Sequence, residues 1–183
     1  MCRIYKDWLS KQQPSMRQAH QYGEKLFIDY CGPTLPITDP ETGERHGAQI
    51  FVAVMGGSNY TFAEATLSQK LEDWVMSHVR AFQFFGAVPD IIVPDNLRSA
   101  TTRACKYDPD LNPTYQQLAA HYNVAIIPAR PLKPKDKAKA ENGVLIVERW
   151  IMAVLRHETF YSLMQLNQRI SELLLRLNSK QFQ

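Results

Sequence analysis

The sequence has little cysteine and no long apolar run. Its three cysteines, Cys2, Cys31 and Cys105, are odd in number and share no metal-ligand spacing, so we expect free thiols in a reducing compartment. No apolar stretch approaches the ~20 residues that a membrane-spanning helix needs, and the first residues lack the apolar core of a signal peptide. We therefore expect a cytoplasmic protein without disulfides or membrane spans.

The chain also has little excess of charge of either sign. Lysine and arginine number 21 against 18 acidic residues, and a net charge of +3 is too small to identify a polyanionic partner. The 183 residues, 45% of them hydrophobic, can build one substantial domain, and we see no internal repeat or low-complexity segment. We expect a lead-in segment over residues 1–22, a core domain over 23–158, and over 159–183 a C-terminal helix that begins a linker to a missing domain.

Apolar periodicity predicts a mixed α/β fold. Strands are expected over residues 25–32, 48–55, 60–66, 91–93 and 124–127, and helices over 68–85, 114–122, 141–156 and 163–177. The order β-β-β-α-β-α-β-α plus an extra C-terminal helix indicates a five-stranded sheet, in which an antiparallel meander joins parallel strands. This is the order of ribonuclease H-like folds.

Helix boundaries have their own signals. We expect Ser68 to cap the first helix and Gly86 to end it, Asn112 to cap the second, and Ser162 with Gln165 to form a capping box for the last. The aromatic residues of the first helix recur at helical spacing, which assigns them to the core rather than to base stacking: they are Trp74, Phe82 and Phe85.

Three carboxylates fall where such a fold places a site. Asp29 interrupts a buried strand, Asp95 follows another apolar run, and Glu141 opens a helix. Converging carboxylates repel one another unless cations neutralise them, and oxygen ligands favour Mg²⁺. Two such ions, with Mn²⁺ as a substitute, can carry phosphodiester chemistry. We therefore predict that these three residues are both the metal ligands and the catalytic residues.

A basic, proline-containing segment precedes Glu141. It contains Arg130, Lys133, Lys135, Lys137 and Lys139, and we expect it to be a loop that holds a phosphate backbone near the metal ions. Alone, it would be interpreted as a solvated charged loop; its position beside the acids favours DNA. Arg98, Arg103 and Lys106 could extend the same surface. Asn96 could contact DNA, orient a ligand, or be only a packing or turn residue.

Several neighbours of the acids have simpler interpretations. Tyr30 could orient a ligand or merely pack, and Cys31 is more plausible as a small buried residue than as a nucleophile. Glu148 competes with Glu141 as third ligand, but we expect it to pair with a cation at the helix surface or to support the fold. The five histidines are scattered, and magnesium chemistry does not require them.

Specific runs resemble the catalytic core of the IstA transposases of the insertion-sequence 21 group. They are Phe51-Val-Ala-Val-Met with Ser58-Asn59-Tyr60, Phe84-Phe85-Gly86 with Val88-Pro89, Val93-Pro94-Asp95-Asn96-Leu97, Pro134-Lys-Asp-Lys-Ala-Lys with Glu141, and Val147-Glu148-Arg149-Trp150. The resemblance spans nearly the whole chain. It places the chain in the Asp-Asp-Glu transposase and retroviral-integrase superfamily and implies that Asp29, Asp95 and Glu141 are the triad.

The resemblance also implies an activity and partners. A bacterial enzyme of this kind would free 3′ hydroxyl ends on its element and transfer them into target DNA. It would act with a helper ATPase and as a multimer on paired ends. Two alternatives stay open: a nucleic-acid-binding or assembly module that is inactive in isolation, and a ribonuclease H-like nuclease.

Overall fold

The computed structural model describes residues 20–95, 101–103, 110–129 and 134–179. For residues 101–103, 110–111 and 134–137 it describes the backbone alone. Nearly all of the expected lead-in segment therefore lies outside the described residues. The same holds for several candidate site residues: Asn96, Arg98, Lys106, Arg130 and Lys133.

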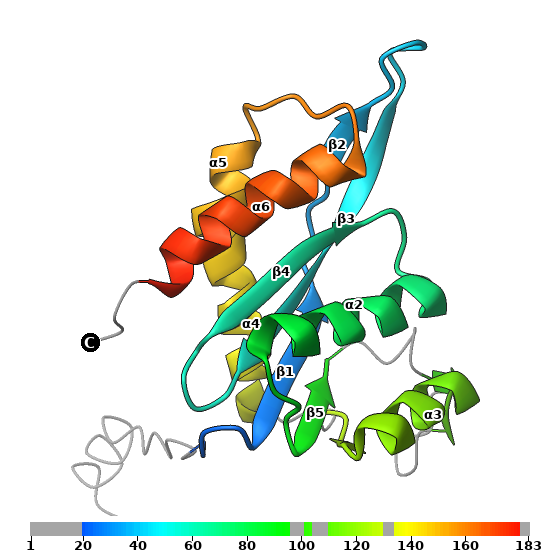
Figure 1. Ribbon diagram of the computed structural model, residues 1–183, viewed down its shortest axis with the longest axis vertical. Helices are drawn as coiled ribbons and strands as arrows, with labels where there is room; N and C mark the ends of the chain where they lie inside the picture. Colours follow the sequence, from blue (N-terminus) through cyan, green and yellow to red (C-terminus); the bar gives the residue numbers. More distant parts are fainter. Residues whose placement is uncertain (1–19, 96–100, 104–109, 130–133, 180–183) are drawn as a thin grey trace, which may run out of the picture.

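A mixed sheet forms the centre of the molecule (Figure 1). Its strands are β1 (Lys25–Tyr30), β2 (Leu35–Thr38), β3 (Arg45–Met55), β4 (Thr61–Thr66), β5 (Ile91–Pro94) and β8 (Ala125–Ile126). The order is β2-β3-β1-β5-β8, and β4, outside this path, also pairs with β3. Strand β1 is antiparallel to β3 and parallel to β5, and β5 is parallel to β8. The predicted meander with parallel additions is confirmed.

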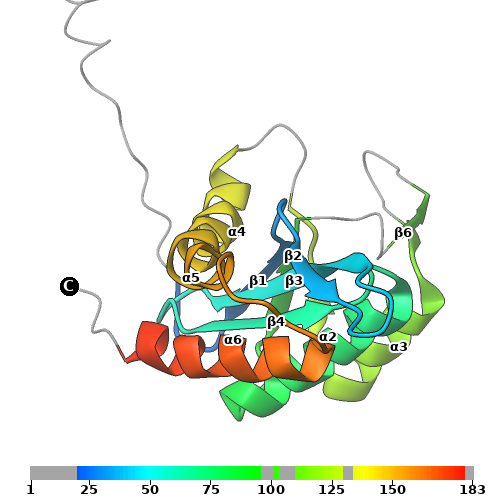
Figure 2. The ribbon, with the colours of Figure 1, turned by 90° about the horizontal axis from the view of Figure 1, so that it is seen from above.

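The sheet has six strands where the sequence predicts five. The additional strand, β2, lies in a segment whose prolines predict a turn. Pro36 is tolerated there because β2 is an edge strand, where a missing N–H need not break a ladder. Strands β6 (Thr101–Arg103) and β7 (Asp110–Leu111) form a separate small sheet that was also not predicted; β6 is labelled in Figure 2.

Helices cover both faces of the sheet. They are α2 (Leu71–Phe85), α3 (Pro113–Tyr122), α4 (Pro134–Val147), a π-helix (Glu148–Met152), α5 (Ala153–Leu155) and α6 (Leu163–Asn178). In Figure 1, α5 and α6 lie at the upper left and α2 and α3 at the lower right. Within the described residues, no helix is long and apolar enough to cross a membrane.

Most of the predicted helix ends are confirmed. Gly86 ends α2 in the left-handed conformation, Asn112 accepts a bond from the backbone of Thr114, and Ser162 accepts one from Gln165. The prediction for Ser68 is wrong, because α2 begins at Leu71 without a side-chain cap. The Ser68 hydroxyl instead lies 2.5 Å from Asp73, an acid in the first turn of α2.

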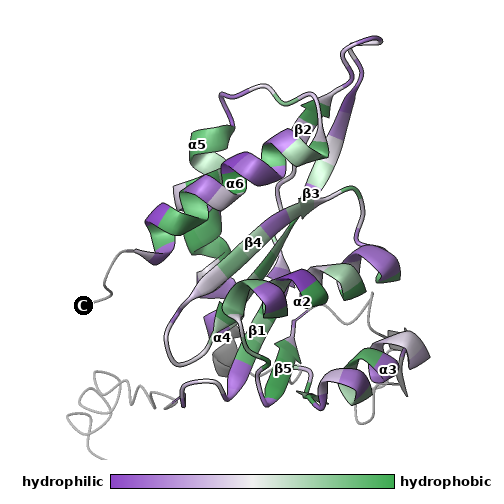
Figure 3. Ribbon diagram, viewed as in Figure 1, coloured by the Kyte–Doolittle hydropathy of each residue, from purple (hydrophilic) through white to green (hydrophobic). Residues whose placement is uncertain are grey.

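Alternation along β1 separates two buried layers. Leu26, Ile28 and Tyr30 pack with the aromatic residues of α2 and α3, among them Trp74 and Phe82 as predicted. Phe85 is only partly buried against that layer. The opposite face of the sheet packs against apolar residues of α6 and of the continuous helical stretch formed by α4, the π-helix and α5. These apolar residues appear green in Figure 3.

The second face of β1 carries Phe27, Asp29 and Cys31. Phe27 shares a small buried cluster with Ala140 of α4, and Cys31 belongs to the large cluster that includes Val147 of α4. Side chains alternate along a strand, so Asp29 lies between Phe27 and Cys31 on the face that α4 covers.

Candidate functional site

The structure brings Asp29 and Asp95 to neighbouring strands. Strands β1 and β5 are paired in parallel as far as Ile28 and Pro94. The Asp95 N–H then donates to the carbonyl oxygen of Ile28 at 3.0 Å. Both aspartates are half-buried, and Asp29 Oδ1 accepts a 2.8 Å bond from the backbone N–H of Tyr30. Asp29 and Asp95 therefore both lie near the carboxyl ends of neighbouring parallel strands, where α/β folds place their sites.

Two glutamates, on α4 and at the start of the π-helix, are candidates for the third carboxylate. Glu141 follows buried Ala140, which lies with Phe27, and its side chain is exposed. Glu148 is half-buried, and it lies close enough to Cys31 to contribute, after burial and together with Asp29, to raising the pKa of the thiol. Glu141 thus follows the residue of α4 that packs on Phe27, whereas Glu148 lies near Cys31. Asp29 lies between Phe27 and Cys31 along the chain, so it faces the stretch of helix between the two glutamates.

A complete metal cage is not formed by the residues that the structure describes. In those ranges, no group of three or more histidine, cysteine, aspartate or glutamate side chains is arranged to hold a metal ion. Asp29 and Asp95 alone still fit a magnesium site, because Mg²⁺ keeps several waters and often binds through one or two carboxylates plus substrate phosphates. The assignment of Glu141 as third ligand stays a prediction.

The basic segment is partly helical, which corrects the expected loop. Helix α4 begins at Pro134, so Lys135, Lys137 and Lys139 lie on its first turns. The side chains of Lys135, Lys137 and Arg103 lie outside the described part. Lys139 is half-buried, and its ammonium donates to Oδ1 of Asn59 in the turn between β3 and β4. Burial lowers the pKa of Lys139, so this lysine is packed against the fold and is not simply solvated.

Tyr30 and Cys31, the neighbours of Asp29, are core residues. The Tyr30 ring lies within 6 Å of the rings of Phe51 and Trp74, on the face of β1 opposite Asp29. Burial raises the pKa of Tyr30 to about 12 and also raises that of the Cys31 thiol. The thiol therefore stays protonated at neutral pH, as expected of a structural cysteine rather than a nucleophile.

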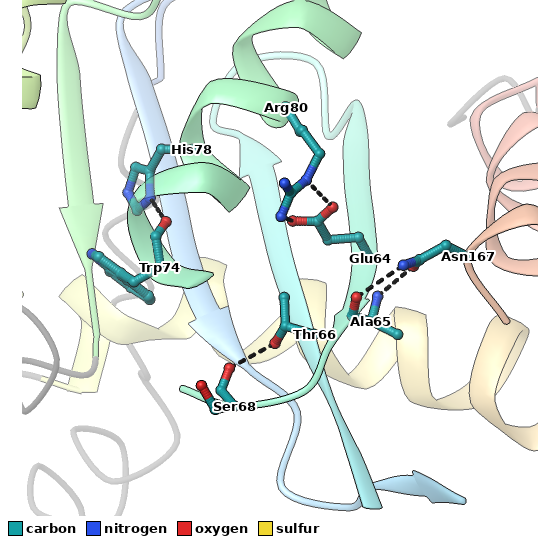
Figure 4. Close-up of polar contacts among 8 residues, drawn as sticks. All are labelled: Glu64, Ala65, Thr66, Ser68, Trp74, His78, Arg80 and Asn167. Atoms are coloured by element: carbon teal, nitrogen blue, oxygen red, sulfur yellow. Dashed lines mark hydrogen bonds and ion pairs between the residues drawn. The ribbon is translucent and has the colours of Figure 1, made fainter. Parts of the chain in front are cut away.

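A half-buried ion pair between β4 and α2 was not predicted. Glu64, only 7% exposed, accepts two bonds from Arg80 of α2, from Nε at 2.5 Å and from Nη2 at 2.8 Å (Figure 4). The bidentate bond raises the pKa of Arg80. An acid inside the β-rich run from Tyr60 to Thr66 was the available signal, because a carboxylate in a buried strand needs a partner. The pair joins α2 to the sheet.

His78 is a second buried polar residue. Its Nδ1 lies 2.7 Å from the carbonyl oxygen of Trp74, also drawn in Figure 4, and its Nε2 lies 3.0 Å from the Tyr115 hydroxyl. A carbonyl can only accept, so Nδ1 carries the proton and Nε2 accepts from Tyr115. Burial lowers the pKa of His78 to about 4. The ring is therefore neutral and structural.

The known proteins that this chain resembles in sequence are transposases. The chain is 50% identical over 181 residues to a transposase for insertion sequence IS408 from Burkholderia multivorans. It is 51% identical over 178 residues to one for IS1162 from Pseudomonas fluorescens, and 25% identical over 160 residues to that of IS21 from Pseudomonas aeruginosa. These alignments cover 99%, 97% and 87% of the chain, but only 35%, 32% and 37% of the relatives. The chain thus spans about a third of their length.

Solved structures show the fold. The catalytic core domain of BIV integrase aligns with 88% of this chain and 87% of its own length, at a TM-score of 0.59 and 13% identity. An HTLV-2 integrase catalytic core domain, solved in complex with magnesium, aligns at a TM-score of 0.60 and 13% identity, over 88% of both chains. No model of a protein family matches the chain. The chain is therefore related to the transposases of the IS408, IS1162 and IS21 insertion sequences and has the ribonuclease H-like fold of an integrase catalytic core.

Proposed function

We propose that this chain carries the DNA-cleaving and strand-transferring centre of a transposase. The observation that carries the proposal is the juxtaposition of Asp29 and Asp95 on neighbouring strands of an integrase-like sheet. Water would be the first nucleophile and would free a 3′ hydroxyl at the element end. That hydroxyl would then attack a phosphodiester of target DNA.

The proposed ligands are Asp29, Asp95 and Glu141, and they would hold two Mg²⁺ ions or Mn²⁺ in their place. Such ions activate the nucleophile and stabilise the leaving oxygen of a phosphoryl displacement. The protein fixes the positions of its own ligands: the Tyr30 N–H orients the Asp29 carboxylate, and the bond from Asp95 to Ile28 anchors the start of the segment after β5. Preset acceptors of this kind reduce the reorganisation that the reaction would otherwise need.

Positive charge close to Asp95 and Glu141 in the sequence supports DNA as the substrate. The proposed backbone contacts are Asn96, Arg98, Arg130, Lys133, Lys135 and Lys137. Lys139 is not among them, because its ammonium donates to Asn59. The finer parts of the proposal rest on the resemblance to the IstA transposases. They are a helper ATPase, a multimer on paired element ends, and the bacterial cytoplasm as the compartment.

Strand transfer by the full-length protein on its own terminal DNA tests the proposal. Asp29→Ala and Asp95→Ala should each abolish cleavage and transfer in Mg²⁺ and in Mn²⁺. Asp90→Ala is the matched control, because Asp90 is exposed just before the other end of β5. Full activity in Asp29→Ala would contradict the proposal.

The same assay separates the alternatives. DNA binding without any metal-dependent chemistry would indicate a binding or assembly module. Hydrolysis without joining of DNA ends would indicate a nuclease.

A further inference from the structure

We propose that Asn59 and Lys139 are positioning residues, which hold the first turns of α4, and with them Glu141, against the turn between β3 and β4. The inference rests on the proposed function, because it concerns the placement of a proposed ligand. It assigns Lys139 to the fold of the site and not to the DNA contacts.

The turn presents the Asn59 side chain in a fixed direction. Asn59 is left-handed, with φ of 58°, a conformation that asparagine tolerates better than most residues. Its N–H donates to the Met55 carbonyl at 2.9 Å, and its own carbonyl accepts from the Thr61 hydroxyl at 2.9 Å. Because the backbone is held on both sides, Oδ1 of Asn59 is a rigid acceptor for the ammonium of Lys139.

The following turn of α4 makes a second close contact with the same hairpin. Gly143 lies against Val54 near the end of β3, and the Cβ of any other residue at this position would clash with Val54 Cγ2. Residues four apart lie on the same side of a helix, so Lys139 and Gly143 present one face of α4 to the hairpin. Between them, Ala140 is buried beside Phe27. Glu141 therefore lies between residues of α4 that contact the sheet or its hairpin, with Lys139 and Ala140 before it and Gly143 after it.

Placement of this segment matters for the proposed reaction. A displacement of about 1 Å at a catalytic group can reduce a rate by about 100-fold. Replacing a lysine that only contacts a phosphate should not slow the reaction step in this way. Such a lysine would contribute to DNA affinity and to the salt dependence of that affinity. The two roles of Lys139 therefore give different experimental results.

The test uses Lys139→Met, Asn59→Gly and the double variant in the full-length protein. Glycine keeps the left-handed backbone and removes only the side chain. Each single variant should lower the single-turnover rate of strand transfer by about 10-fold or more and raise the Mg²⁺ concentration for half-maximal rate. The double variant should be no slower than the slower single variant, because both changes remove one contact. DNA affinity and its salt slope should stay unchanged, and Lys139→Arg should recover part of the rate.

Matched controls lie elsewhere in the fold. Asn123→Gly changes the other left-handed asparagine of the described residues, with φ of 52° at the end of α3, and Lys70→Met changes an exposed lysine next to α2. Both should transfer at the unaltered rate.

Wild-type rates in Lys139→Met, additive losses in the double variant, or a lower salt slope would each overturn the inference. If the unaltered protein performs no strand transfer, the proposed function fails. Hydrogen exchange then decides the positioning role by itself. Faster exchange of the amides of residues 140–143 in Lys139→Met supports it, and unchanged exchange overturns it.

Discussion

Asn167 of α6 bonds both backbone groups of Ala65 on β4. The Ala65 N–H donates to Oδ1 of Asn167 at 2.6 Å, and Nδ2 of Asn167 donates to the Ala65 carbonyl at 2.9 Å (Figure 4). Asn178, close to three helical turns later, makes the same pair of bonds with Thr61 at 2.9 and 2.7 Å. Strand β4 is an edge strand, whose outer backbone groups would otherwise be free to pair with another chain. Two asparagines therefore take the place of a neighbouring strand.

Replacing one of these asparagines should destabilise the fold without affecting chemistry directly. Asn167→Ala should lower the free energy of unfolding by about 1–3 kcal/mol, because two hydrogen bonds are removed at a half-buried site. Urea unfolding at pH 7 measures the change. Gln168→Ala, at the exposed neighbouring position, is the control and should differ from the parent by less than about 0.5 kcal/mol. Equal losses in the two variants would mean that the Asn167 bonds contribute nothing.

The pair of Glu64 and Arg80 should respond asymmetrically to mutation. Arg80→Met leaves a buried carboxylate without its partner, whereas Glu64→Gln leaves a guanidinium that is 41% exposed and can be solvated. We expect Arg80→Met to lower the free energy of unfolding by about 1–3 kcal/mol, less than for a fully buried pair because solvent screens Arg80. Glu64→Gln should cost less. Thermal melting of both variants checks the order, and a larger loss in Glu64→Gln would contradict it.

His78 should make the fold sensitive to acid. Its pKa is about 4 when folded and about 6.5 when unfolded, so only the unfolded chain takes up this proton between those values. Stability should therefore fall as pH decreases from about 6.5 to 4, by up to about 3 kcal/mol in total. Unfolding of the parent and of His78→Gln by urea at pH 7 and pH 5 measures the effect.

The His78→Gln variant should lose less stability than the parent between these two pH values, even if it is less stable at pH 7. His157→Gln, at an exposed position, is the control and should follow the parent. A pH dependence that His78→Gln leaves unchanged would assign the acid sensitivity to other groups.

The sequence was sufficient for the mixed sheet and for the positions of Asp29 on β1 and of Asp95 just after β5, because apolar periodicity and the end of a buried strand are local signals. The start of α4 was not predictable in the same way: Pro134 is a favourable first helical residue, but the apolar stripe appears only from Val144. Long-range pairs such as Lys139 with Asn59, or Asn167 with Ala65, have no local signal. Their partners become neighbours only when the sheet and helices pack.

Lys135 and Lys137 should contribute phosphate contacts, whereas Lys139 should not. Replacing Lys135 and Lys137 together by glutamine should weaken binding to unrelated DNA sequences nearly uniformly. It should also reduce the slope of log affinity against log salt by up to about one unit for each phosphate that the variant no longer binds. Lys139→Gln is the matched control on the same helix and should leave the slope unchanged. An unaltered slope in the double variant would mean that these lysines are only a solvated face.

The roles of Glu141 and Glu148 can be distinguished by whether replacing each residue reduces strand transfer or changes the melting temperature. The two residues are seven apart, which is close to two turns and about 10 Å along the axis, so both cannot reach one pair of metal ions. Glu148 is half-buried near Cys31 and begins the π-helix, so its environment belongs to the packed layer under the sheet. Glu141 is exposed on the turns that Lys139 and Gly143 fix to the hairpin, where bound DNA and metal ions could reach it.

Glu141→Gln should therefore keep the melting temperature and DNA binding but lose strand transfer. Glu148→Gln should change the melting temperature more than the rate, because a half-buried charge is neutralised beside Cys31. Thermal melting and single-turnover transfer, measured on both variants with Asp90→Ala as the common control, provide the test. If Glu148→Gln instead melts like the parent and transfers no DNA while Glu141→Gln stays active, the third ligand is Glu148. The π-helix would then be the feature that turns this carboxylate toward Asp29.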